Sequence, residues 1–308
     1  LLNLDYEVSG SDLRPSPITD RLKDLGGIVF VGHAATNTRG ADVVVTSSAI
    51  ADNNPEVAAA RDAGIPVIPR AEMLAELMRM RHGILIAGSH GKTTTTSMMA
   101  TVFEAANLDP TVVIGGRLEA WGTNARLGQG EFMVAEADES DGSFLRLTPT
   151  VAIVTNIDTE HLDHYGSFEA IQNAFLEFTN KVPFYGFSVL CADDPHVQKL
   201  ISSLDRKVVT YGLKESFDYS AHNVVSAPNG MVFNAFQKEK KLGKVHIRLR
   251  GYHNVSNAMA AVAVGIEFGI SFEQIQKALK EFRGIHRRFE HVGEVNGITV
   301  VDDYGHHP

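Results

Sequence analysis

A short run of this chain combines closely spaced glycines with a lysine and several hydroxyl groups: Gly88-Ser89-His90-Gly91-Lys92-Thr93-Thr94. The backbone N–H groups of such a loop can surround a phosphate, and the N-terminus of a following helix also favours an anion. Lys92 would add a positive charge, and the hydroxyl of Thr93 is placed to hold a magnesium ion. The run therefore predicts a site for the phosphate tail of a nucleoside triphosphate.

The segments on either side of this loop are suited to position it. The apolar run 83–87 predicts a buried strand, and the residues after Lys92 predict a helix with Met98 and Phe103 on its apolar side. The spacing departs from the usual phosphate-loop pattern, because Ile86 stands where the earlier glycine is expected. A glycine turn with a solvated lysine is the alternative interpretation, and the flanking strand and helix favour phosphate binding.

Carboxylates follow two further apolar runs. Residues 132–135 lead into the acidic stretch 136–141, and residues 151–154 are followed closely by Glu160 and His161. Crowded carboxylates repel one another, so a cation is expected among them. Strands that end in acidic or imidazole groups beside a phosphate loop predict a magnesium site. The alternatives are a solvated acidic loop and, for His161, a structural or surface histidine.

Residues 1–80 alternate short strand-like and helix-like stretches, for example 6–9, 28–31 and 43–46 as strands. This alternation predicts parallel strands with helical crossovers in a small Rossmann-like sheet, whose ligands gather at the carboxyl ends of the strands. Asp12 and the segment 46–50 lie at such ends, and Asp12 is a candidate for bonding a ribose or a base. An ordinary polar turn is the alternative.

Two asparagines open an alanine-rich helical stretch near the end of the chain. Asn254 and Asn257 are three residues apart, so a helix places them on one face, where their amides could meet the edge of a base. Capping of the helix by Asn254 is the alternative. The preceding residues 206–250 predict an antiparallel β appendage on the main sheet.

The composition is that of a globular protein of about two domains: 44% of the 308 residues are hydrophobic and 21% are charged. The net charge of −9 argues against nucleic acid as a partner. No apolar run reaches the about 18 residues that a membrane span needs, so no membrane insertion is expected. Cys191 lies in the apolar run 187–192 and is interpreted as a core thiol in a reducing cytosol, which predicts a cytoplasmic protein.

Taken together, these segments resemble the Mur ligases, the ATP-dependent amide-forming enzymes of peptidoglycan assembly. The motifs that carry the resemblance follow the family's order and cover nearly the whole chain: 88–96, 136–141, 155–158 with His161, 251–257, Arg287-Arg288-Phe289 and 302–308. The last of these, Asp302-Asp303-Tyr304-Gly305-His306-His307-Pro308, is similar to the branch that adds L-alanine.

The resemblance implies both a reaction and its reactants. ATP would convert the lactyl carboxylate of UDP-N-acetylmuramate into an acyl phosphate, and the amine of L-alanine would then displace phosphate. ATP and Mg2+ would be the cofactors, and UDP-N-acetylmuramate and L-alanine the substrates. The product would enter cell wall synthesis.

The resemblance also implies roles for individual residues. Lys92, Glu136 and His161 would be catalytic. Of the metal ligands, Thr93 and Glu136 would hold one magnesium ion, and His161 would help to hold a second. The ATP site would comprise Gly88, Ser89, His90, Gly91, Lys92, Thr93, Thr94, Asn254, Asn257, Arg288 and Asp303. The UDP-sugar site would comprise Asp12, Ser47, Ser48, Ala49, Asn124 and Arg126.

The expected architecture is an α/β chain of three parts. Residues 1–80 would form a Rossmann-like UDP-sugar-binding domain, residues 81–290 a P-loop ATP-binding domain, and residues 291–308 a hinge and first strand of a C-terminal Rossmann-like domain. The chain starts at Leu1 without a methionine, so we expect a fragment at this end. It stops at Pro308, just past the expected hinge, so we also expect that most of the third domain is missing and that the chain does not turn over as written.

Other functions remain open at this point. The chain is also compatible with a tripeptide-recycling relative in the same family, or with a folylpolyglutamate-type enzyme that shares the loop. A phosphate-loop NTPase or kinase would release phosphate without an amino acid, but it leaves residues 1–80 unexplained. A nucleotide-sugar-binding module without ligation is a further alternative.

Overall fold

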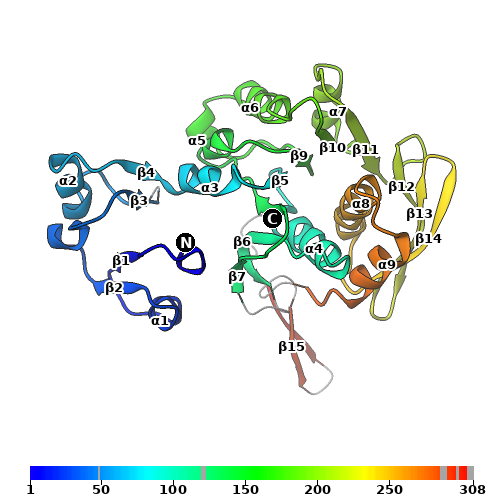
Figure 1. The fold of residues 1–308 in the computed structure, drawn as a ribbon. Helices are drawn as coiled ribbons and strands as arrows, with labels where there is room; N and C mark the ends of the chain where they lie inside the picture. The colour runs from blue at the N-terminus through cyan, green and yellow to red at the C-terminus, as the bar shows by residue number, and fades with distance from the viewer. Residues whose placement is uncertain (48, 119–122, 285–289, 296–297, 304–308) are drawn as a thin grey trace. The chain divides into compact units, whose positions relative to one another are not determined.

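The computed structural model describes residues 1–47, 49–118, 123–284, 290–295 and 298–303 (Figure 1). The chain divides into two compact units, Leu1–Leu77 and Met78–Pro308. Each unit is built from alternating strands and helices, and the predicted α/β class is confirmed. No helix within the described ranges is long and apolar enough to cross a membrane.

The first unit contains two pairs of parallel strands, β1 with β2 and β3 with β4. Its elements in order are η1 Leu2–Leu4, β1 Ser9–Asp12, α1 Pro17–Asp24, β2 Ile28–Val31, η2 Ala35–Thr38, β3 Val44–Thr46, α2 Pro55–Asp62, β4 Val67–Pro69 and α3 Arg70–Met78, which leads into the second unit. Ser16 caps α1 by accepting a hydrogen bond from the backbone N–H of Thr19 at 3.2 Å.

The first strand lies later in the chain than the sequence suggested. The apolar pattern placed it at 6–9, whereas Ser9–Asp12 pairs with β2, with Asp12 opposite Val31. The pairing partner, which side-chain alternation does not reveal, sets the position of this polar strand. Asp12 still ends the strand, so it remains at the carboxyl edge.

The second unit is organised around a ten-stranded sheet in the order β14-β13-β12-β11-β10-β9-β5-β8-β6-β7. Its strands are β5 His82–Ala87, β6 Thr111–Leu118, β7 Thr123–Arg126, β8 Phe132–Glu136, β9 Val151–Val154, β10 Phe187–Cys191, β11 Val208–Gly212, β12 Tyr219–Ala227, β13 Gly230–Gln237 and β14 Lys240–Ile247. In the middle of this order, β11, β10, β9, β5, β8 and β6 run parallel, and β7 pairs antiparallel with β6 at one edge. The expected antiparallel appendage is β12 to β14, which continues the same sheet through the parallel pairing of β12 with β11.

Helices cover both faces of this sheet (Figure 1). The helices α4 Lys92–Ala105, α8 Tyr252–Glu267 and α9 Phe272–Glu281 pack together, whereas η3 Ser143–Arg146, α5 Leu162–Tyr165, α6 Phe168–Asn180 and α7 Pro195–Ile201 lie on the other side. Ile84 and Ile86 join the apolar core with Met98 and Met99 of α4, while Leu85 between them is equally buried. A strand that is buried on both faces reads as a continuous apolar run, which is why 83–87 stands out in the sequence.

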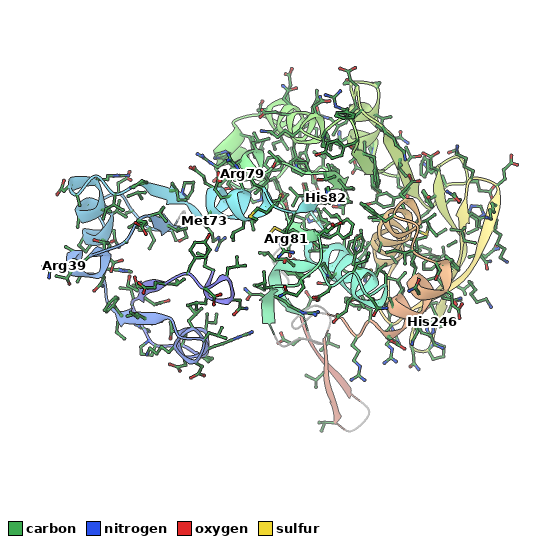
Figure 2. The ribbon with its side chains drawn as sticks, viewed as in Figure 1. Arg39, Met73, Arg79, Arg81, His82 and His246 are labelled. Atoms are coloured by element: carbon green, nitrogen blue, oxygen red, sulfur yellow. The ribbon has the colours of Figure 1, made fainter. Side chains whose placement is uncertain are left out.

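The start of β5 is held by side chains next to the strand. Arg81 donates a hydrogen bond to the carbonyl oxygen of Gly130, and the ring of His82 lies 5.9 Å from that of Phe132 (Figure 2). Near the end of the described chain, β15 Glu290–Val295 and β16 Ile298–Asp302 form an antiparallel hairpin.

Candidate functional site

Three neighbouring parallel strands bring the candidate site together. In the sheet, β9, β5 and β8 lie side by side, and their carboxyl ends lead respectively into Thr155-Asn156-Ile157-Asp158, the glycine loop and the acidic stretch from Glu136. Carboxyl ends of parallel strands meet at one edge, which is where ligands bind in such folds. Residues as far apart in sequence as Ser89 and Asp158, which are 69 positions apart, therefore share one location.

The loop between β5 and α4 depends on two glycines with positive φ. Gly88 has φ of 135°, and a Cβ there would lie only 2.1 Å from the hydroxyl oxygen of Thr155. Gly91 caps α4 with φ of 83°, and a Cβ there would lie 2.8 Å from the side-chain oxygen of Asn257. Both positions exclude a side chain on conformational and on steric grounds.

The segment after β9 holds this loop in shape. The N–H of His90 donates to Asn156 Oδ1 at 2.8 Å, and Asn156 Nδ2 donates back to the carbonyl oxygen of His90 at 3.0 Å. Thr155 Oγ1 donates to the same carbonyl at 2.6 Å, and the N–H of Asp158 donates to Ser89 Oγ at 2.8 Å. Residues 155–158 form one of the motifs that carry the resemblance. The structure adds that Thr155, Asn156 and Asp158 form hydrogen bonds with the loop.

Lys92 does not extend into solvent. Its Nζ donates to the carbonyl oxygen of Gly88 at 2.7 Å and to Glu139 Oε1 at 2.8 Å. The two side chains are 16% and 3% exposed, so this is a buried ion pair. Burial raises the pKa of Glu139, and the neighbouring ammonium group of Lys92 opposes that rise. The sequence placed Glu139 in an acidic cluster without singling it out.

Thr93 and Glu136 form one possible set of ligands for a cation. Glu136 Oε1 accepts a hydrogen bond from the N–H of Gly115 at 2.7 Å, and its side chain also accepts one from Thr93. Burial raises the pKa of Glu136, partly offset by these hydrogen bonds and by Lys92. A hydroxyl and a carboxylate on neighbouring elements fit magnesium, which prefers oxygen ligands and keeps several waters.

A second set of ligands lies around His161. Single ligand atoms of Glu139, Glu160 and His161 all lie within 4.8 Å of one another, close enough to share one ion. His161 begins α5 with φ of 57°, an uncommon conformation for a residue other than glycine. The resemblance implied that His161 helps to hold a second ion, apart from the one at Thr93 and Glu136. The structure groups His161 with Glu139 and Glu160, which were not selected as ligands. The only sequence signal for Glu160 was its place next to His161.

Of the two predicted asparagines of α8, Asn257 lies against the loop and Asn254 lies beside Asn257. Asn257 is 7% exposed, touches the Gly91 position as described, and donates to Asn254 Oδ1 at 3.4 Å. Asn254 Nδ2 donates to the carbonyl oxygen of Arg250 at 2.7 Å. The structure therefore brings Asn257 to the glycine loop and Asn254 next to Asn257, and the contact of both residues with adenine stays a prediction.

The remaining predicted residues are placed as follows. Asp12 Oδ1 accepts from the N–H of Arg14 at 3.2 Å, and Ser47 and Ala49 follow β3. Asn124 is exposed on β7, and Asp303 is exposed after β16. Ser48 and Arg288 lie outside the described residues, and all these roles stay predictions.

Arg126 of β7 already has acidic partners. Its guanidinium nitrogens lie 2.7 Å from Glu104 and 2.7 Å from Asp109, and its side chain is 33% exposed. These contacts join β7 to the end of α4 and the loop after it. A role beside the muramyl lactate, which the resemblance implies, stays a prediction for this residue.

A polar cluster in the first unit was not anticipated from the sequence. Glu56 of α2 accepts hydrogen bonds from Ser11 Oγ at 2.7 Å, Asn37 Nδ2 at 2.7 Å and the N–H of Ala34 at 3.2 Å. Ser11 Oγ also lies 2.9 Å from His33 Nδ1. Burial of Glu56 opposes ionisation, but these hydrogen bonds outweigh it and hold its pKa below the ordinary value.

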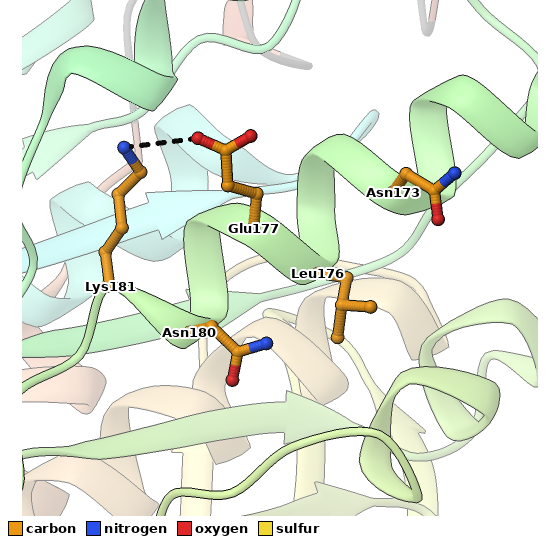
Figure 3. Close-up of a pocket in the computed structure, with 5 residues that line it drawn as sticks. All are labelled: Asn173, Leu176, Glu177, Asn180 and Lys181. Atoms are coloured by element: carbon orange, nitrogen blue, oxygen red, sulfur yellow. Dashed lines mark ion pairs between the residues drawn. The ribbon is translucent and has the colours of Figure 1, made fainter.

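A surface hollow elsewhere on the second unit carries none of this chemistry. It is lined along and just beyond α6 by Asn173, Leu176, Glu177, Asn180 and Lys181 (Figure 3). Lys181 and Glu177 form an ion pair at 3.4 Å across one turn of the helix. An exposed pair of this kind contributes little, and no predicted site residue lines the hollow.

The mostly parallel sheet, the glycine loop at a helix N-terminus and the adjacent oxygen ligands define a nucleotide-binding α/β domain of the phosphate-loop class. Comparison with protein families is more specific. Residues 86–265 match the Mur ligase middle domain, and residues 1–82 match the Mur ligase family, catalytic domain. The chain belongs to the Mur ligase family, which uses ATP, and the resemblance noted from its motifs is confirmed.

Individual relatives agree with this assignment. The chain is 58% identical over its whole length to the UDP-N-acetylmuramate–L-alanine ligase of Geotalea daltonii, of which it covers 67%. Among solved structures, the UDP-N-acetylmuramate-alanine ligase MurC of Thermotoga maritima aligns with a TM-score of 0.85 at 31% identity, covering 97% of this chain and 69% of that one. The UDP-N-acetylmuramate:L-alanyl-gamma-D-glutamyl-meso-diaminopimelate ligase of Neisseria meningitides aligns with a TM-score of 0.84 at 30% identity, covering 93% of each chain.

Proposed function

We propose that this protein is the ligase that joins L-alanine to the lactyl carboxylate of UDP-N-acetylmuramate at the expense of ATP, in the cytoplasm, for peptidoglycan synthesis. The observation that carries the proposal is the position of Lys92 in the glycine loop between two sets of oxygen-rich ligands, Thr93 with Glu136 and Glu139 with Glu160 and His161. The 58% identity to an alanine-adding relative supports the choice of amino acid.

Within this proposal, the chain's residues bind and orient a triphosphate. The N–H groups at the start of α4 and the ammonium group of Lys92 would face the phosphates. Thr93 and Glu136 would hold one Mg2+ ion, and His161 would help to hold a second. Bound Mg2+ supplies positive charge that neutralises the phosphate oxygens. Asn257, which lies against the loop, and Asn254, which is hydrogen-bonded to Asn257, would meet adenine.

The chemistry proceeds in two steps. A carboxylate is a poor electrophile, so the lactyl carboxylate first attacks the γ-phosphorus of ATP, releasing ADP and forming an acyl phosphate. The uncharged amine of L-alanine then attacks the acyl carbon and forms a tetrahedral oxyanion. This intermediate collapses to the amide by expelling phosphate, and the nitrogen loses one proton to solvent. Lys92 and the loop amides contribute chiefly by positioning and by neutralising charge, which needs no proton transfer from the loop.

An assay of ADP and phosphate release by the full-length protein tests the proposal. We expect turnover only when UDP-N-acetylmuramate and L-alanine are both present. Turnover with L-alanyl-gamma-D-glutamyl-meso-diaminopimelate in place of L-alanine would instead favour the tripeptide-recycling activity, for which a solved relative of similar fold is known. Release of phosphate without any amino acid would favour a simple NTPase.

A further inference from the structure

The ion pair of Lys92 with Glu139 stands between the phosphate loop and the second set of ligands. Nζ of Lys92 lies 2.8 Å from each carboxylate oxygen of Glu139, and Oε1 accepts the hydrogen bond. Oε2 is fully buried and accepts no hydrogen bond. Oε1 therefore accepts a hydrogen bond from the lysine. Oε2 lies close to the same positive charge but accepts no hydrogen bond.

The same carboxylate faces the ligand atoms of Glu160 and His161. All three residues offer an atom within 4.8 Å of the others, and Glu139 is the buried member of the group. The ammonium group of Lys92 is one cationic partner of Glu139, and an ion held by this group would be a second. The ionised Glu139 needs at least one of these partners, because a buried charge without a partner is strongly unfavourable.

We propose that Glu139 exchanges partners when nucleotide binds: it pairs with Lys92 in the nucleotide-free protein and becomes a ligand of a divalent cation, shared with Glu160 and His161, once Lys92 turns to the phosphates. The inference rests on the proposed binding of ATP at the loop. Lys92 and the cation compete for Glu139, so nucleotide and cation binding favour one another.

Competition gives an unusual expectation for the nucleotide-free protein. Removing the ammonium group in Lys92→Met frees Glu139, so Mn2+ should bind more tightly, by about tenfold or more, since a neighbouring charge commonly changes such an equilibrium by at least that factor. Any nearby positive charge repels Mn2+, however, so the gain must be shown to pass through Glu139. The double variant Lys92→Met/Glu139→Gln provides that comparison.

The experiment measures Mn2+ binding by electron paramagnetic resonance in the wild type, in each single variant and in the double variant, all without nucleotide. The expected result is a gain from Lys92→Met in the wild-type background that disappears in the Glu139→Gln background. An equal gain in Mn2+ affinity in both backgrounds would mean that Lys92 acts only by long-range repulsion of the ion. That result would overturn the partner exchange. An unchanged Mn2+ affinity in Lys92→Met would overturn it as well.

A second measurement concerns nucleotide binding without metal. Glu139→Gln should tighten the binding of ADP in the presence of a chelator, because Lys92 no longer has to leave an ionised partner. The matched control Glu160→Gln should weaken Mn2+ binding and leave chelated ADP binding unchanged. Equal chelated ADP affinities in wild type and Glu139→Gln would contradict the exchange, whereas absence of any nucleotide binding in the wild type would contradict the proposed function itself.

Folding of the variants is checked by thermal melting. If Glu139→Gln does not fold, the wild type alone still tests the inference, because saturating ADP should strengthen Mn2+ binding at a site beyond the one that the nucleotide itself brings. A Mn2+ stoichiometry that rises by only one ion with ADP would then overturn the proposal, and a rise by two would support it.

Discussion

The two units of this protein are stabilised in different ways. In the second unit, strands β5, β8 and β9 are almost entirely buried, and their ends carry the phosphate loop and the acidic groups. In the described residues of the first unit, Val57 and Ala60 are the only buried hydrophobic side chains, and hydrogen bonds to Glu56 join α2 to β1 and to η2.

The difference shows what each kind of site requires. A triphosphate site needs backbone amides and charges held to within fractions of an ångström, and a densely packed sheet supplies that rigidity. The first unit relies on a polar network around one carboxylate, so its order should depend on pH and on single hydrogen bonds. The following predictions test that contrast, beginning with the largest expected effect.

The replacement of Lys92 should have the largest effect on activity. In the full-length protein, Lys92→Met should lower the rate of alanine-dependent phosphate release by about 10²-fold or more, as removal of a charge-stabilising group from such a site commonly does. Lys240→Met, which removes an exposed lysine of β14, is the matched control and should retain the wild-type rate. An undiminished rate in Lys92→Met would show that Lys92 of the loop does not take part in the reaction.

A methyl group at Gly88 should disturb the rigid site itself. The positive φ and the 2.1 Å approach to Thr155 Oγ1 force the loop to move in Gly88→Ala. The free energy of unfolding should fall by about 2 kcal/mol or more from backbone strain and the clash. Denaturant unfolding and the affinity for an ATP analogue measure the two consequences.

The control for this substitution is Gly293→Ala. Gly293 of β15 has no atom within 4 Å of its would-be Cβ, and its φ is not in the positive region. We expect wild-type stability and nucleotide affinity from Gly293→Ala. Equal behaviour of the two variants would show that the loop tolerates displacement, and the contrast between the units would weaken.

Acid should loosen the first unit before the second. The pKa of Glu56 is lower in the folded protein than its ordinary value of 4.5, so the ionised group stabilises the unit at pH above 4.5. That contribution is lost as the pH falls through the lower, folded-state pKa. Hydrogen exchange of amides in residues 1–77 of the intact protein should therefore accelerate below pH 4.5, relative to the buried strands of the sheet.

The variant Glu56→Gln separates this effect from general acid denaturation. It keeps the shape of the side chain but lacks the charge, so hydrogen exchange in residues 1–77 should be faster already at pH 7. The reason is the loss of charge-assisted hydrogen bonds, which contribute about 1.5–3 kcal/mol to stability. The additional acceleration in acid should be absent. If Glu56→Gln showed the same acceleration of exchange in acid as the wild type, other titrating groups would be responsible for it.

The smallest effect on stability is expected at Arg126. Its ion pairs with Glu104 and Asp109 are partly exposed, so Arg126→Met should change the free energy of unfolding by no more than about 1 kcal/mol. If Arg126 also contacts the muramyl lactate, the KM for UDP-N-acetylmuramate should rise while the KM for ATP stays constant. An unchanged KM for the sugar would restrict Arg126 to its structural ion pairs.

The strand, glycine loop and helix that would form the nucleotide site were predictable because their signals are local. The apolar run 83–87, the glycines at 88 and 91 and the following helix are contiguous, and their geometry follows from residue types that tolerate few other conformations. The partners of these residues were less accessible. Glu139 and Glu160 resembled any other members of an acidic stretch until the fold set Glu139 beside Lys92 and grouped both carboxylates with His161.

By itself, the sequence determined the α/β class, the family and the location of the phosphate loop, because strand and helix periodicity and the order of motifs are properties of the linear chain. Only the tertiary structure decided that Lys92 pairs with Glu139, that Asn257 packs on Gly91 and that Glu56 joins β1 to η2. Those contacts connect residues between 19 and 166 positions apart. Distances across such separations arise from sheet order and helix packing, which no local pattern of side chains encodes.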